Sequence, residues 1–76
     1  MFVIIAGGGR TGAHLASILL AQGHQIHIIE HREEVLSRLH RQLPTETIIE
    51  GETTDPQLLL QAGIERAHVV AACTSI

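Results

Sequence analysis

Four short apolar runs alternate with segments of helical periodicity along the 76-residue chain. The runs are rich in valine and isoleucine and are bounded by turn residues, so they predict β-strands at residues 2–6, 26–29, 47–49 and 68–72. Nearly continuous apolarity in the first and last runs is typical of strands that are buried on both faces of a parallel sheet. His27 interrupts the second run, and we therefore expect that strand to be less covered.

Three segments between the strands have helical spacing: residues 11–22, residues 32–41, and a stretch that opens at 54–57 and closes at Gly63. On the outer face of the second segment, Glu34 and Arg38 lie one turn apart and are expected to pair. Asp55 or Thr54 can cap the start of the third helix, and a glycine suits its C-terminal end.

The order β-α-β-α-β-α-β with short connections predicts a parallel sheet with right-handed crossovers. The natural strand order is 3-2-1-4, so the fold class is α/β, a Rossmann-like doubly wound parallel sheet. The printed sequence ends directly after the fourth strand, without a closing helix. We therefore expect residues 1–76 to form a single Rossmann-like domain that is truncated, a fragment of a longer domain.

Charge and cysteine content exclude several classes of protein. A net charge of −3 and a pI near 6.0 give no attraction to phosphate backbones or anionic lipid, so nucleic acid and membrane surfaces are not expected as direct partners. The apolar run at 2–6 is too short for a signal peptide or a membrane span. The single cysteine, Cys73, cannot form an internal disulfide, and a cytoplasmic location without membrane insertion is expected.

The turn after the first strand carries the strongest chemical signal. It has the pattern G-x-G-x-x-G and consists of Gly7, Gly8, Gly9, Arg10, Thr11 and Gly12. In this pattern the first glycine permits a tight turn, the second lets the backbone approach a pyrophosphate, and the third lets the helix pack closely on the strand. Amides at the helix start would then face the phosphates, and Arg10 could add a charge-assisted contact. The alternative is a tight connection that binds nothing.

Glu30 ends the second predicted strand, eighteen residues after the last glycine of the turn. A carboxylate at that place can accept hydrogen bonds from both hydroxyls of an unphosphorylated adenosine ribose. The alternative is a solvated acid at a strand end. Arg32 could accommodate a 2′-phosphate, but the carboxylate favours the unphosphorylated ribose. His31 is a candidate neighbour of the adenine ring.

No catalytic or metal-binding constellation is predicted. The six histidines fall on different predicted elements, without a His-x-x-x-His pair or a Cys–His cluster, which favours solvated or packed roles over a metal site. Cys73 follows the last strand with no identifiable base, so a small residue at a buried edge is favoured over a nucleophile.

Together these motifs resemble the TrkA-N domain, also called the regulator-of-potassium-conductance (RCK or KTN) domain, of bacterial Trk/Ktr-type potassium transport systems. The resemblance covers nearly the whole chain. It rests on the glycine turn with its arginine, on the strand-end acid Glu30, and on Gly-Glu-Thr-Thr-Asp-Pro at 51–56, where the family commonly has Gly-Asp-Ala-Thr. Residues 60–67 and 72–75 also follow the family pattern.

The resemblance implies an NAD(P)-binding Rossmann-like regulatory domain, not an enzyme, that binds NAD(H) or an adenine nucleotide (ATP, ADP or AMP). The implied partner is a membrane potassium transporter or channel subunit at the inner face of the cell membrane, and the full-length protein is expected to be a homo-oligomer. Carried onto this sequence, the family pattern places residues 7–11 at the phosphates, Glu30 at the ribose, Glu52 and Thr53 near the adenine, and Cys73 and Thr74 on the far side of the cleft.

Two other interpretations stay open from the sequence alone. The chain could be the N-terminal cofactor-binding part of an NAD-dependent oxidoreductase whose catalytic residues lie in another domain. It could also be a structural Rossmann half that binds nothing. In each case an exposed fourth strand would be a pairing edge that favours self-association.

Overall fold

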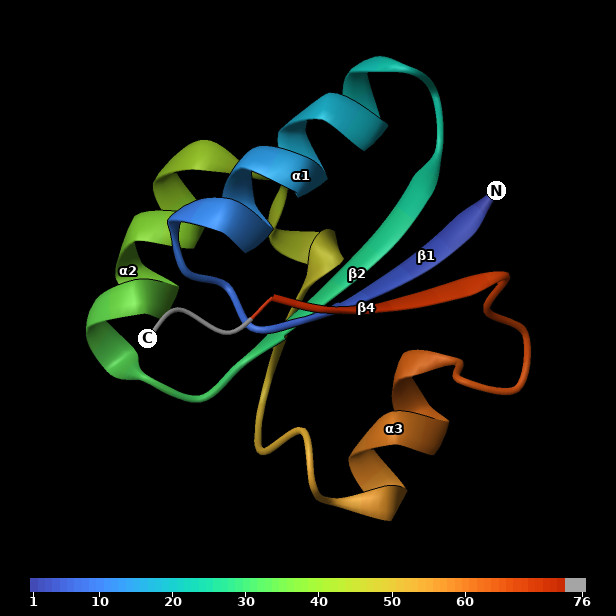
Figure 1. Cartoon of the computed structure of the whole chain (residues 1–76). Helices are drawn as coiled ribbons and strands as arrows, with labels where there is room; N and C mark the ends of the chain where they lie inside the picture. Colours follow the sequence, from blue (N-terminus) through green and yellow to red (C-terminus); the bar gives the residue numbers. More distant parts are fainter. Residues whose placement is uncertain (74–76) are drawn as a thin grey trace.

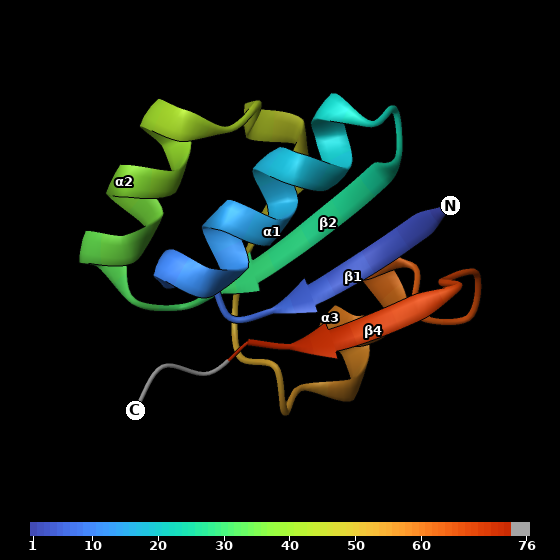
Figure 2. The same ribbon diagram turned by 45° about the horizontal axis from the view of Figure 1, so that its top comes forward.

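The computed structural model describes residues 1–73 as a parallel β-sheet with helices on both faces (Figure 1). The elements follow one another as β1 (Phe2–Ala6), α1 (Arg10–Ala21), β2 (Gln25–Glu30), α2 (Glu33–Gln42), the 3₁₀ helix η1 (Thr45–Thr47), β3 (Ile48–Glu50), α3 (Pro56–Ala62) and β4 (Val69–Ala72). Figures 1 and 2 show α1 and α2 on one face of the sheet and α3 on the other. None of the helices in this part of the chain has the length and apolarity needed to cross a membrane.

The four strands are parallel and lie in the order β3-β2-β1-β4, which confirms the predicted order 3-2-1-4. In the register of the sheet, Ile5 of β1 lies between Ile28 of β2 and Ala71 of β4. On the far side of β2, Glu30 pairs with Glu50 of β3. Because every strand runs in the same direction, the carboxyl ends of all four strands meet at one edge of the sheet.

Alternate side chains of the strands build a separate core on each face of the sheet. The core under α1 and α2 contains buried residues of two strands, both helices and the segment after α2: Val3, Ile5, Ala13, Ala16, Ile26, Ile28, Val35, Leu39 and Leu43. The core under α3 is smaller and consists of Phe2, Ile4, Ile29 and Ala62. The same alternation places Glu30, two residues after Ile28, on the face that α1 and α2 cover.

Strand β2 is buried over most of its length, and the weaker covering expected for it is limited to exposed Gln25 and half-buried His27. Ile28 and Ile29 are completely buried because β2 lies inside the sheet, between β1 and β3. His27 is accommodated by its own contacts. Its Nδ1 donates a 2.7 Å hydrogen bond to the Ala62 carbonyl, and its ring meets the Phe2 ring edge-on with centroids 5.2 Å apart.

Strand β4 is exposed, so the expectation that it is buried on both faces is also wrong. Val69 and Val70 are 44% and 50% exposed. Within residues 1–73, β4 pairs with β1 alone and contributes no residue to either buried core. The apolarity of a strand shows that the strand can pack against other apolar residues, but burial also requires residues that cover it. The described residues leave Val69, Val70 and Ala72 exposed.

The ends of the third helix follow the predicted signals. Asp55 accepts a 3.0 Å hydrogen bond from the Gln57 amide at the start of α3, and Gly63 ends the helix with a left-handed φ of 92°. Strand β3 begins one residue later than predicted because Thr47 belongs to η1, where its hydroxyl donates a 2.7 Å hydrogen bond to the Pro44 carbonyl.

Candidate functional site

The segments that follow the parallel strands gather at one edge of the sheet. Figure 2 shows the arrowheads of β1, β2 and β4 at this edge, where the glycine turn leads from β1 into α1. The chain leaves β1 towards the face of α1, whereas the neighbouring strand β4 follows α3 on the opposite face. A reversal of this kind opens a crevice between two neighbouring loops, and open α/β sheets bind their ligands at such a crevice.

Three glycines of the turn occupy positions that a side chain would disturb. Gly7 has a left-handed φ of 109°, and its N–H donates a 2.9 Å hydrogen bond to the Ile29 carbonyl. A Cβ at Gly8 would lie 2.5 Å from Cδ1 of Leu39 on α2. A Cβ at Gly12 would overlap the carbonyl oxygen of Gly7. The turn therefore leaves no space for a side chain at Gly8 or Gly12, and at Gly7 it has a backbone conformation that favours glycine.

The start of α1 has amides that no side chain caps. The N-cap residue is Gly9, which has no side chain, and the first turn of the helix contains no acidic residue. The first amides of a helix have no acceptor within the helix, and the helix dipole places positive potential at them. This end of α1 is therefore suited to a phosphate or another anion.

Glu30 is buried, with only 2% of its surface exposed, and its carboxylate accepts hydrogen bonds from three residues. Oε1 accepts from the Gly8 amide at 2.8 Å and from Nη2 of Arg32 at 3.1 Å. Oε2 accepts from the amides of His31 and Arg32, each at 2.9 Å, and from Nε of Arg32 at 3.0 Å. These contacts tie the glycine turn to the end of β2, and they occupy the acceptor positions of the carboxylate.

The hydrogen bonds determine the ionisation of Glu30. Burial raises the pKa of this carboxyl, but the bonds from the Arg32 side chain and from the amides of Arg32, Gly8 and His31 lower it by more. The pKa falls from the ordinary 4.5 to about 2 as a result. The same ion pair raises the pKa of Arg32. Glu30 is thus a buried carboxylate with bonded oxygens, which differs from the solvated strand-end acid considered as the alternative.

A cavity of about 270 Å³ brings several of the predicted site residues together. Its lining consists of Ala6, Gly7, Ile29, Glu30, His31, Arg32, Thr53 and Cys73. Glu52 lies beside this cavity, since its Oε1 is 3.5 Å from Nδ1 of His31. Residues from four separate segments of the chain therefore surround a single space. They include residues that the sequence pattern assigns to the phosphates, the ribose, the adenine and the far wall.

Three further residues of the turn line a second space of about 270 Å³ next to the first. It is lined by Gly9, Arg10, Thr11, Arg32, Val35 and Arg38. Arg32 contributes to both spaces, so its side chain lies between the helix start and the cavity at Glu30. Gly9, Arg10 and Thr11 thus line a space that adjoins the cavity at Glu30, and Arg32 lines both.

Arg38 is the residue of this region that the sequence interpretation missed. The predicted ion pair with Glu34 is wrong, because the ion pairs found in residues 1–73 join other residues. Arg38 instead lines the space at the start of α1. The sequence does contain a signal for this placement, since Arg38 stands beside Leu39 and three residues after Val35, both of which are buried.

Two further points concern the predicted residues. Thr74 lies outside the described residues. Up to Cys73, the fold brings no three histidine, cysteine, aspartate or glutamate side chains close enough together to hold a metal ion.

The fold and the site define the class of protein, a Rossmann-like α/β domain with a glycine turn and a strand-end acid at the carboxyl edge of its sheet. Comparison with known families then gives the particular family. The TrkA-N domain matches residues 3–76, and the chain belongs to this family, which confirms the resemblance seen in the sequence.

Similar sequences occur in proteins named for potassium uptake. The chain is 38% identical over 74 residues to the Trk system potassium uptake protein TrkA homolog of Methanothermobacter thermautotrophicus, a match that covers 97% of this chain and 34% of that protein. It is 39% identical over 75 residues to the TrkA homolog of Archaeoglobus fulgidus, covering 97% of this chain and 16% of that protein. It is 34% identical over 73 residues to the TrkA protein of Halomonas elongata, a match that covers 96% of this chain and 16% of that protein. The chain therefore spans 16–34% of the length of these relatives.

Proposed function

We propose that this chain is a regulatory, non-enzymatic domain that binds NAD(H) or an adenine nucleotide (ATP, ADP or AMP) and thereby controls potassium uptake or channel gating. The observation that carries the proposal is the uncapped start of α1 beside the cavity at Glu30. A ligand with a phosphate at the helix start and a ribose at the carboxylate would be an adenine nucleotide or dinucleotide.

Each part of the ligand has candidate residues at this edge of the sheet. The amides of the turn from Gly7 to Thr11 and the guanidinium of Arg10 would hold the phosphates, and Glu30 would hold the ribose. The adenine would lie near His31, Glu52 and Thr53, with Cys73 and Thr74 on the far wall. Most of the described members of this set line one of the two adjoining spaces, which supports this assignment. Gly8 and Glu52 line neither space, but Gly8 donates a hydrogen bond to Glu30 and Glu52 lies beside His31.

Ribose binding at Glu30 requires Arg32 to move. Three backbone amides and the Arg32 guanidinium now use the acceptor positions of the carboxylate. The amides are fixed by the loop, whereas the Arg32 side chain is 42% exposed and can turn into solvent. We infer that the ribose hydroxyls replace the guanidinium as donors to Glu30.

The role in potassium transport rests on the family and on the relatives. These are named as Trk system potassium uptake proteins, and we infer that this chain acts with a membrane potassium transporter or channel subunit at the cytoplasmic face. A regulatory domain of this kind needs only a difference in ligand affinity between two states of its assembly. A homo-oligomer of the full-length protein would provide such states.

Arg10→Gln is expected to weaken the binding of ATP and ADP about five- to tenfold, because one charge-assisted contact to a phosphate is lost. Isothermal titration calorimetry with NAD⁺, NADH, ATP, ADP and AMP measures the effect. Arg41→Gln is the matched control, since it removes the same charge from an exposed position of α2 that lines neither space. If the unaltered protein binds none of the five ligands, the proposed function is wrong.

A further inference from the structure

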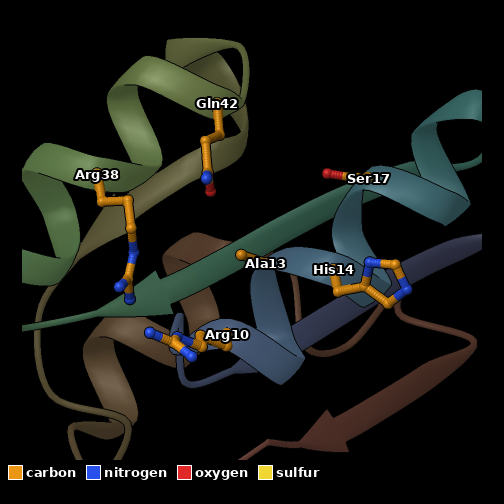
Figure 3. A pocket seen from close by; sticks show the side chains of 6 residues that line it. All are labelled: Arg10, Ala13, His14, Ser17, Arg38 and Gln42. Carbon is orange, nitrogen blue, oxygen red and sulfur yellow. The ribbon is translucent and has the colours of Figure 1, made fainter.

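An open groove of about 600 Å³ runs between α1 and α2, away from the cavity at Glu30 (Figure 3). Four of its lining residues come from α1 and two from α2: Arg10, Ala13, His14, Ser17, Arg38 and Gln42. All of these residues except Ala13 have polar side chains. No acidic residue lines the groove, so its lining is entirely neutral or basic.

Two arginines from different helices share this groove. Figure 3 shows the Arg38 side chain extending from α2 towards the end of the groove where Arg10 begins α1. In the part of the chain that the structure describes, neither guanidinium forms an ion pair with a carboxylate. Two like charges in one concave space raise the local positive potential, which concentrates anions there.

The groove is continuous with the phosphate side of the proposed nucleotide site. Arg10 and Arg38 both line the groove, and both also line the smaller space beside Gly9 and Thr11. A chain of phosphates that starts at the amides of the turn can therefore extend past Arg10 towards Arg38. Arg38 differs from Arg32 in being free for this contact, because Arg32 is paired with Glu30.

We propose that Arg38, together with Arg10, forms an anion subsite between α1 and α2 that takes the terminal phosphate of a nucleoside polyphosphate. The inference rests on the proposed nucleotide binding and extends it, because the subsite makes affinity increase with the number of phosphates. Guanidinium groups suit this role since they donate several charge-assisted hydrogen bonds to phosphate oxygens. Ser17 and Gln42 supply further polar groups along the same groove.

Arg38→Gln tests the subsite through the difference between ligands. In magnesium-free buffer, we expect this variant to weaken the binding of ATP about tenfold, of ADP by less, and of AMP by less than about twofold, because one charge-assisted contact to the terminal phosphate is lost. Calorimetric titration gives the three affinities. The matched control is Arg41→Gln, one turn further along α2 and outside the groove, which should leave all three affinities unchanged. Circular dichroism shows whether each variant is folded.

Inorganic triphosphate separates this inference from the proposed function. If the protein binds triphosphate in an Arg38-dependent manner but binds no adenine nucleotide, the subsite stands and the proposed function fails. An equal loss for ATP, ADP and AMP in Arg38→Gln, or the same losses in Arg41→Gln, would overturn the subsite while leaving nucleotide binding intact. If Arg38→Gln weakens the binding of neither triphosphate nor ATP, the proposed subsite is also overturned.

Discussion

Replacing Glu30 by glutamine is expected to lower the free energy of unfolding at pH 7 by about 3 kcal/mol. The pKa of Glu30 falls from 4.5 to about 2 in the folded protein, and each unit of such a shift corresponds to about 1.4 kcal/mol. Glutamine keeps the shape of the side chain but removes the charge. Its amide group would also place a donor against the donors of Gly8, His31 and Arg32. Urea denaturation at pH 7 measures the loss.

The pH dependence of stability gives a second test of the same residue. The folded-state pKa of Glu30 lies below its unfolded value, so its stabilising effect is complete above pH 4.5 and is lost as the pH falls towards about 2. The glutamine variant should lack this part of the acid destabilisation. Glu50→Gln is the matched control, because Glu50 is the neighbour of Glu30 in the sheet but is exposed. Equal effects of the two substitutions would contradict the stabilising role of Glu30.

Gly12→Ala is expected to destabilise the fold by about 3 kcal/mol, as overpacking at a backbone contact does. The added Cβ would overlap the carbonyl oxygen of Gly7 and lie 3.4 Å from Cγ2 of Ile5, so α1 must move away from β1. The better helix propensity of alanine, worth about 1 kcal/mol, offsets only part of this cost. Because the amides at the start of α1 are those that we propose to face the phosphates, nucleotide affinity should fall as well. Thermal unfolding and calorimetric titration measure the two effects.

Gly23→Ala separates this clash from ordinary backbone strain. Gly23 has a left-handed φ of 86°, but no atom lies within 4 Å of the place where its Cβ would be. We expect a cost of about 1 kcal/mol from the backbone conformation alone and no change in nucleotide affinity. If Gly12→Ala is no more destabilising than Gly23→Ala, the close packing of α1 on the glycine turn is not important for stability.

The topology could be predicted because its causes are local in the sequence. Apolar runs bounded by glycine, proline and polar residues define the strands, and right-handed crossovers then leave few possible strand orders. Signals such as Asp55 and Gly63 fix a helix end within a residue or two. Burial of β4 could not be predicted in the same way, because exposure depends on which other residues pack against a strand.

Most of the residues around the two spaces could be proposed from the sequence, but their contacts could not. The glycine turn and Glu30 follow from a spacing that the backbone imposes. In contrast, the ion pair of Arg32 with Glu30 depends on which of several side-chain conformations Arg32 prefers. The position of Arg38 in the groove depends on how α2 lies against α1. Helical spacing places Glu34 one turn from Arg38, yet a surface pair of this kind is worth only about 0.3–0.5 kcal/mol. That energy is too small to decide the direction of an arginine side chain.

The binding of an adenine nucleotide at the glycine turn is tested most directly by the amide chemical shifts of the ¹⁵N-labelled protein during titration with ATP, ADP, AMP, NAD⁺ and NADH. At least one of these ligands should shift the amides of Gly8, Gly9, Arg10 and Thr11 together with those of His31 and Arg32, in a saturable manner and at the same ligand concentration. Shifts confined to other parts of the chain, such as α3, or no saturable shifts with any of the five ligands, would contradict nucleotide binding at this turn.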